Sequence, residues 1–224
     1  MLTDEKSLTA DGEISYRRQS WTMSASMFSL IGFALFLSAC SYGPAPPILI
    51  PGPMVPPVQK FGDSVNLTTI HTLPTQLPEE MSNVGTLYKL NGEHSELITD
   101  TPLGPSLDSI LVDQMKAAGL TVSPAKNLNH EVTLQVFVIK FEDKIKEKLV
   151  NTEQSGKIEM KAVMILHSGS STRTLTRTVE RHRSPTSKFS FDKKDPAILL
   201  GYLYSEAISK DLIPYIKKKL GEPR

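Results

Sequence analysis

The chain has 224 residues, and its 25 lysines and arginines nearly balance its 24 aspartates and glutamates, which gives a formal net charge of +1. A balance this close to zero argues against nucleic acid as a partner, because proteins that bind it rely on a basic surface. Cys40 is the single cysteine, so no internal disulfide can form and the fold must rest on its hydrophobic core. The length fits one ordinary domain with a tail.

The most apolar stretch of the chain, Met27–Ala39, lies directly before this cysteine. It has the length of a signal-peptide hydrophobic region and is shorter than the roughly 20 residues that a membrane-spanning helix needs. Arg17 and Arg18 supply the positive region that precedes such a segment. We therefore predict that residues 1–39 are a signal peptide, whose removal takes away three basic and four acidic residues and leaves a net charge of +2. The alternatives are an uncleaved signal anchor and a lone buried cysteine in a core helix.

The end of this stretch, Leu37-Ser38-Ala39-Cys40, resembles the lipobox of bacterial lipoproteins. There, a dedicated peptidase recognises the residues before the cysteine and cleaves next to it. The cysteine thiol carries a diacylglycerol, and the new amino end receives a further acyl chain such as palmitate. Two or more acyl chains give a firm membrane anchor. The residue after the cysteine is Ser41 and not an aspartate, which is similar to the pattern in lipoproteins that are sorted to the outer membrane. We predict a lipid on Cys40 and a location at the outer membrane, facing the periplasm.

A proline-rich segment follows the cysteine, and residues 41–59 hold seven of the sixteen prolines. Proline removes backbone donors and favours the extended polyproline II conformation, so this segment cannot form a helix or a central strand. We predict a semi-rigid tether over residues 40–62 that spaces the lipid from a single domain over residues 63–224. Ile48–Ile50 are apolar enough to rest on the domain or on a partner.

The first half of the domain shows short strand patterns and one helix. Residues 66–70 and 84–90 have the composition of strands, and Asn91-Gly92 predicts a turn into a third strand over residues 93–99. Apolar residues at helical spacing predict a helix over residues 106–118, capped by Ser106 and closed by Gly119 in the left-handed conformation.

The second half predicts three strands and a closing helix. Strands are expected over residues 130–141, 157–167 and 172–183, with a charged hairpin tip or short helix over residues 142–155. A helix over residues 196–220 should kink or split at Pro214. Together the elements predict an α+β fold, with a small, mostly antiparallel sheet packed against two helices.

One face of the last predicted strand is rich in arginine. Four arginines share the same parity along this strand: Arg173, Arg177, Arg181 and Arg183. They suit acidic headgroups or a carboxylate patch on another protein. The alternative is an exposed strand whose charges discourage edge-to-edge aggregation, and we favour that interpretation.

Motifs of common enzymes and cofactor sites are missing from the sequence. It contains no GxGxxG, GxxxxGK[ST], HExxH, CxxC or GxSxG motif, and its five histidines are scattered. We therefore expect no enzymatic activity, no catalytic residues, no cofactor and no metal site.

The order of elements resembles the YajG-like lipoproteins of Gram-negative bacteria. The features that carry the resemblance are the lipobox, the stretch Met115–Val122 (MKAAGLTV) at a helix end, the strand residues Leu134–Val136 (LQV), two further antiparallel strands and a C-terminal helix. The resemblance implies an outer-membrane lipoprotein with a small α+β domain and no defined activity.

Three functions fit this class of protein. The first is a binding or scaffolding module that holds another envelope protein at the membrane. The second is an auxiliary lipoprotein of an ABC-type transport system, which carries lipid or other apolar cargo in a groove between sheet and helices. The third is an activator of peptidoglycan synthesis. The sequence does not distinguish them, because apolar stripes that face a core and those that face a groove have the same pattern. It also leaves the oligomeric state open.

Overall fold

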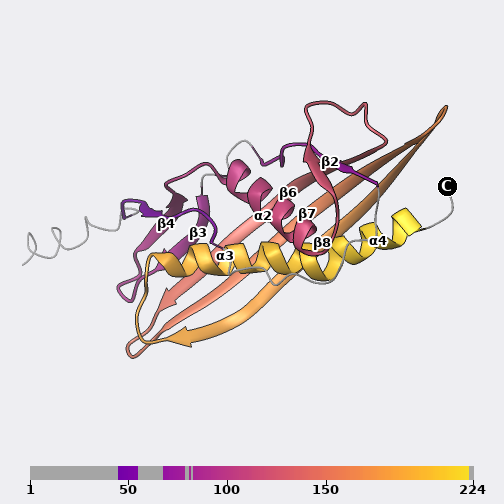
Figure 1. The fold of residues 1–224 in the computed structure, drawn as a ribbon. Helices are drawn as coiled ribbons and strands as arrows, with labels where there is room; N and C mark the ends of the chain where they lie inside the picture. Colours follow the sequence, from indigo (N-terminus) through magenta and orange to yellow (C-terminus); the bar gives the residue numbers. More distant parts are fainter. Residues whose placement is uncertain (1–44, 55–67, 79–80, 82, 222–224) are drawn as a thin grey trace, which may run out of the picture. The chain divides into compact units, whose positions relative to one another are not determined.

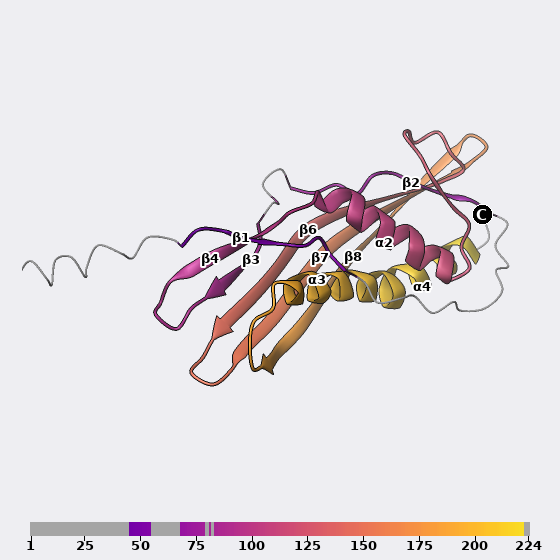
Figure 2. The same cartoon turned by 60° about the vertical axis from the view of Figure 1, so that its left-hand side comes forward.

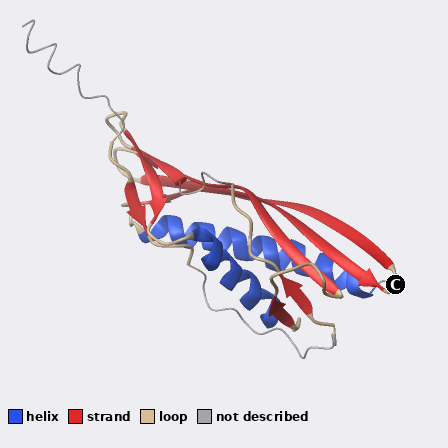
Figure 3. Ribbon diagram, turned by 90° about the horizontal axis from the view of Figure 1, so that it is seen from above, coloured by secondary structure: helices blue, strands red, loops and turns tan. Residues whose placement is uncertain are grey.

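The computed structural model describes residues 45–54, 68–78, 81 and 83–221. Within them an eight-stranded sheet is covered on one face by helices (Figures 1 and 3). The predicted α+β class is confirmed. The prediction of a small, mostly antiparallel sheet is corrected, because the sheet is larger and mixed. Four of its strand pairs are parallel and three are antiparallel.

The bounds of the elements show long strands in the second half of the chain and short ones in the first. The strands are β1 (Ile48–Ile50), β2 (Ile70–Thr72), β3 (Asn83–Tyr88), β4 (His94–Thr99), β5 (Val122–Pro124), β6 (Val132–Glu147), β7 (Thr152–Ser168) and β8 (Ser171–Lys188). The helical elements are α2 (Leu103–Ala117), α3 (Lys194–Ala207), the π-helical turn η1 (Ile208–Leu212) and α4 (Ile213–Gly221).

The sheet forks along β6. On one side β6 pairs with β7 over its whole length, and β7 pairs with β8. On the other side β6 changes partner, because Thr133 and Leu134 pair with β2 and residues 143–146 pair with β3. The long strands β6, β7 and β8 therefore form the main part of the sheet. Two groups of short strands, β3 with β4 and β1, and β2 with β5, extend it from different parts of β6 (Figure 2).

A β-bulge in β6 explains why its buried residues change parity along the strand. Val132, Leu134, Val136 and Val138 share one parity, but Phe141 and Ile145 have the other, and all six are buried. The register against β7 shifts between Val138 and Lys140, so the extra residue moves the following side chains to the same inner face. The same face of β6 is therefore buried along the whole strand, although the parity of its buried residues changes.

The hairpin between β6 and β7 is longer than predicted. The charged segment 142–155 contains the hairpin turn, which was one of the two predicted alternatives, and it forms no helix. The turn is confined to residues 148–151, since β6 continues to Glu147 and β7 starts at Thr152. Lys144 and Lys146 point to solvent while Ile145 is buried, which is ordinary strand alternation. In β7, which matches the strand predicted over residues 157–167, alternate residues are buried: Ile158, Met160, Ala162, Met164 and Leu166.

The helices pack their apolar faces on the sheet. Helix α2 starts at Leu103 instead of Ser106, and its cap position is Pro102, which makes no side-chain capping bond. Gly119 ends this region with a φ of 81°, as predicted. The closing helix breaks into α3, η1 and α4, with the π-helical turn just before Pro214. Proline lacks the amide hydrogen that an α-helix needs, so the break lies near the predicted position.

Part of the predicted tether belongs to the domain. β1 pairs in parallel with β4, and Ile50 is only 1 % exposed. The Met54 amide donates a hydrogen bond to the Ala197 carbonyl in α3 at 3.0 Å. Gly201 permits this approach, because a Cβ there would lie 2.2 Å from the Met54 carbonyl oxygen. Residues 45–54 therefore lie on the domain and do not form a free spacer, with β1 at the edge of the sheet, where proline is tolerated nearby.

Candidate functional site

A groove opens where β6 changes partner. The bridge between Gln76 and Phe137 ends the contact on the β2 side, and the pairing with β3 begins at Asp143 with Gly85. Among the described residues no strand pairs with β6 between these points on that side. A short stretch of strand edge, residues 139–142, is therefore left beside the groove.

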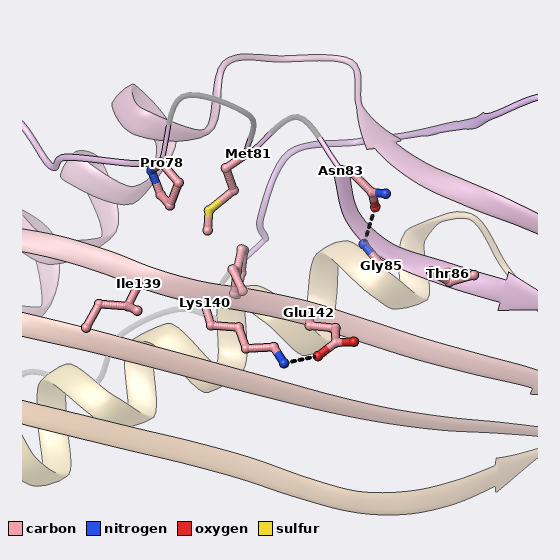
Figure 4. A pocket seen from close by; sticks show the side chains of 9 residues that line it. Pro78, Met81, Asn83, Gly85, Thr86, Ile139, Lys140 and Glu142 are labelled. Atoms are coloured by element: carbon pink, nitrogen blue, oxygen red, sulfur yellow. Dashed lines mark hydrogen bonds and ion pairs between the residues drawn. The ribbon is translucent and has the colours of Figure 1, made fainter.

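The groove is about 350 Å³ in volume and combines apolar and polar walls. It is lined by Pro78, Met81, Asn83, Gly85, Thr86, Ile139, Lys140, Phe141 and Glu142. Figure 4 shows Pro78 and Met81 on one side, with Ile139 and Lys140 of β6 facing them across the groove. Ile139 lies between the part of β6 that contacts the β2 side and the part that pairs with β3. Its side chain is 47 % exposed, an unusually high fraction for an isoleucine in a strand. The groove thus offers an apolar contact next to backbone groups.

Gly85 fixes one end of the groove. A Cβ at this position would lie 2.2 Å from the carbonyl oxygen of Asp143, so only glycine allows β3 to approach β6 this closely. The register of β3 against β4 shifts between Asn83 and Gly85, and Asn83 Oδ1 accepts a hydrogen bond from the Gly85 amide at 3.0 Å. These contacts hold the start of β3 at the point where the groove closes.

The charges of the groove compensate each other. Lys140 Nζ lies 2.8 Å from one carboxylate oxygen of Glu142, and Lys144 Nζ lies 3.1 Å from the other. The hydrogen bond from Lys140 is the main reason that the pKa of Glu142 is below its ordinary value, against the opposing effect of burial. The groove therefore has no strong net charge at neutral pH and suits a ligand with peptide-like polarity.

Asp143, which pairs with Gly85 at the end of the groove, is fully buried. Burial raises the pKa of its carboxyl from 3.8 to about 7, and the hydrogen bond that Gln154 Nε2 donates to Oδ2 at 2.6 Å offsets this only in part. The carboxyl is therefore partly protonated at neutral pH. A titrating group of this kind is a frequent feature of functional sites, although it also occurs in buried structural networks.

Three of the four arginines on β8 contact the C-terminal helical region. Arg181 Nε donates to Asp211 of η1 at 2.7 Å. The Arg177 guanidinium lies 5.9 Å from the Tyr215 ring centre, and that of Arg183 lies 5.3 Å from the Tyr202 ring centre. Arg173, the fourth, is exposed near the start of β8. A role of the four arginines in binding an anionic partner therefore stays a prediction. The sequence did not reveal that Arg177, Arg181 and Arg183 contact the C-terminal helical region of the same chain.

Two histidines that are 59 positions apart come together. The rings of His71 on β2 and His130, just before β6, stack with their centres 3.8 Å apart. Burial and, to a lesser degree, His130 lower the pKa of His71. No sequence signal marks this pair, because the parallel pairing of β2 with β6 creates it. Within residues 45–54, 68–78, 81 and 83–221, there is no group of three or more His, Cys, Asp or Glu residues that could hold a metal ion.

The predicted lipid-attachment site lies outside the described residues. Leu37, Ser38, Ala39 and Cys40 all precede residue 45, so the structure does not describe the predicted cleavage site. In the part that it does describe, no helix is both long enough and apolar enough to cross a bilayer.

Comparisons with known proteins give structural likeness only. No family model matches the chain, and no curated protein matches it. A solved structure from Xanthomonas campestris, of family model DUF330, is 15 % identical, with 80 % of this chain and 94 % of that chain covered at a TM-score of 0.41. Lipoprotein GNA1162 from Neisseria meningitidis is 9 % identical, with 68 % and 96 % covered at a TM-score of 0.28. These scores are too low to establish a shared family.

Proposed function

We propose that this chain is a lipid-anchored protein of the bacterial envelope whose domain binds an extended segment of another envelope protein and catalyses no reaction. The lipobox-like residues that end in Cys40 support the anchor, which we place at the outer membrane, facing the periplasm. The binding role is supported by the groove beside β6. The proposal thus joins an attachment point outside the described residues to a binding surface within them.

The edge of β6 at residues 139–142, which no strand of the described residues pairs on the side of the groove, is the observation that carries the binding role. An extended peptide can add to an exposed strand edge through main-chain hydrogen bonds, while alternate side chains enter adjacent pockets. Residues 139–142 supply such an edge, and Ile139 and Met81 supply an apolar contact beside it. The compensated pair of Lys140 and Glu142 leaves room for a ligand without a strong charge.

Lipid cargo is less well supported by this groove. A carrier of apolar cargo would need a groove between sheet and helices, where Leu111, Met115 and Tyr204 are instead buried at no more than 1 % exposure. The groove beside β6 is also partly polar and is about the size of a few side chains. Activation of peptidoglycan synthesis remains a special case of the proposed role, in which the bound partner is a synthase.

Site-specific photocrosslinking in cells tests the proposal. A photoreactive amino acid at position 139 should form an adduct with one envelope protein, and a matched variant at Ser170, in the turn between β7 and β8, should not form it. Met81→Asp should weaken the adduct from position 139, because it places a charge across the groove. Equal adducts from both positions, or none from position 139 in a folded and exported protein, would contradict the proposal.

A further inference from the structure

One row of neighbouring residues crosses six chain segments at one end of the sheet. It runs through Ala45, His94, Tyr88, Lys146, Glu153 and Ser187. At the ordinary strand spacing of about 4.8 Å, this row is roughly 24 Å wide. Figure 2 shows the same end, where the β3–β4 and β6–β7 turns and the end of β8 lie together.

The chain enters the domain at this end. The Ala45 amide donates to the His94 carbonyl at 3.1 Å, and β1 then runs parallel to β4, away from the β3–β4 turn. Five positions separate Cys40 from Ala45, and an extended chain covers at most about 3.6 Å per residue. A lipid on Cys40 therefore cannot be attached more than about 18 Å from Ala45, even with the intervening residues fully extended.

Exposed apolar side chains gather just beyond the row. Leu149 and Val150 in the β6–β7 turn are 91 % and 78 % exposed, Phe189 after β8 is 94 % exposed, and Leu90 in the β3–β4 turn is 58 % exposed. We call Leu90, Leu149, Val150 and Phe189 the tip cluster. Turns between strands ordinarily carry polar residues, so four large apolar side chains in neighbouring loops at one end indicate a surface that something covers.

Lysines surround the tip cluster. A hollow of about 470 Å³ between the two turns is lined by Tyr88, Lys89, Lys144, Lys146, Glu147 and Lys148. Several lysines at this end have acidic partners, as in the pairs of Lys89 with Glu93 and of Lys188 with Asp195. The surface is therefore not strongly basic overall. Exposed apolar side chains with lysines beside them are the pattern of a surface at a bilayer interface.

We propose that the tip cluster enters the interface of the bilayer that holds the Cys40 lipid, so that this end of the domain rests on the membrane. The proposal depends on the lipid anchor of the proposed function. The short distance from Cys40 to Ala45 favours the membrane over a protein partner as the surface that covers the tip cluster, because it keeps this end of the domain close to the lipid. The docked segment 45–54 strengthens the argument, because a free spacer would have held the domain several nanometres away.

Fluorescence of single labels tests this contact. Once Cys40 is acylated, the mature protein has no free thiol, so a cysteine at position 150 or 189 takes the label alone. The purified lipidated protein is reconstituted into vesicles of phosphatidylethanolamine and phosphatidylglycerol with an environment-sensitive dye at Val150→Cys, Phe189→Cys or Ser170→Cys. Ser170, in the turn between β7 and β8 at the other end of these strands, is the matched control.

The expected result is a blue shift at positions 150 and 189, with loss of quenching by aqueous iodide and gain of quenching by nitroxide-labelled lipid. Position 170 should show none of these changes. Protein that floats with the vesicles while positions 150 and 189 stay fully open to iodide would overturn the membrane contact and leave the anchor intact. A blue shift of the same labels in the Cys40→Ala protein in buffer, with neither vesicles nor detergent, would show that a second copy covers the tip cluster, which also overturns the proposal. Protein that does not float at all would overturn the anchor and this contact together.

Discussion

Arg181 Nε on β8 donates a hydrogen bond to Asp211 Oδ2 on the π-helical turn η1 at 2.7 Å, and this pair ties the edge strand of the sheet to the broken C-terminal helix. Both side chains are less than one third exposed. The guanidinium of Arg181 therefore binds a carboxylate of its own chain, whereas the sequence alone had suggested that it could bind an anionic partner.

The pair should contribute measurably to stability. In a double-mutant cycle with Arg181→Gln and Asp211→Asn, we expect a coupling energy of about 1 kcal/mol, because partial burial raises the value above that of a fully exposed pair. Urea unfolding of the four proteins measures it. Additive effects of the two changes would show that the pair has no energetic role.

The buried carboxyl of Asp143 should make the folded protein less stable as pH rises. Its pKa is about 7 in the folded state and near 3.8 when the chain is unfolded, so between these values the folded state binds the extra proton. Stability from this group is therefore full below pH 4 and is lost as pH rises through 7. Full ionisation of such a group costs up to about 4 kcal/mol. Asp143→Asn should raise the free energy of unfolding at pH 8 and leave it little changed at pH 4.

Glu142→Gln is the matched control for this pH effect. Its neighbours Lys140 and Lys144 lower the pKa of Glu142, so ionised Glu142 stabilises the fold at neutral pH and loses this contribution as pH falls through its lowered pKa. The two variants should therefore shift the pH dependence of urea unfolding in opposite directions. If Asp143→Asn had the same pH profile as the unchanged protein, the buried carboxyl would not titrate as described.

Gly85→Ala should open the junction of β3 with β6. The added methyl group would lie 2.2 Å from the Asp143 carbonyl oxygen, so the strands must separate, at a cost of about 1–3 kcal/mol. Gly104→Ala in helix α2 is the control, since its Cβ would meet ordinary contacts at 3.9 Å and alanine favours a helix. Thermal unfolding should show a lower midpoint for the first variant and an equal or higher one for the second. Equal midpoints for Gly85→Ala and the unchanged protein would be evidence against the close approach.

Periodic segments of the fold could be predicted from the sequence. The alternation from Ile158 to Leu166 predicted β7 and its buried face, and the apolar spacing after Pro105 predicted most of α2. Both signals are local, since they arise from the geometry of a single element. The left-handed Gly119 and the break near Pro214 were equally local.

Features that depend on distant pairing could not be predicted. Strand β1 has only three residues, too few for a period, and it exists because it pairs with β4, far along the chain. Of the strand predicted over residues 66–70, Ile70 is the residue that falls in β2, whose position is set by pairing with β5 and β6. The bulge after Val138 changes the parity of β6, which no alternation rule can place in advance. The groove beside Ile139 and the stacked pair of His71 with His130 arise from the same long-range pairing.

The intact mass of the protein from the membrane fraction of cells tests the central claim, a lipid-anchored domain, most directly. We predict a polypeptide whose first residue is Cys40, with the added mass of a diacylglycerol on the thiol and of an acyl chain on the amino group. Cys40→Ala, with residues 1–39 replaced by an ordinary cleavable export signal, should give an unmodified chain in the soluble periplasmic fraction. A mature protein with a free thiol at Cys40, or an uncleaved chain that keeps residues 1–39, would contradict the account.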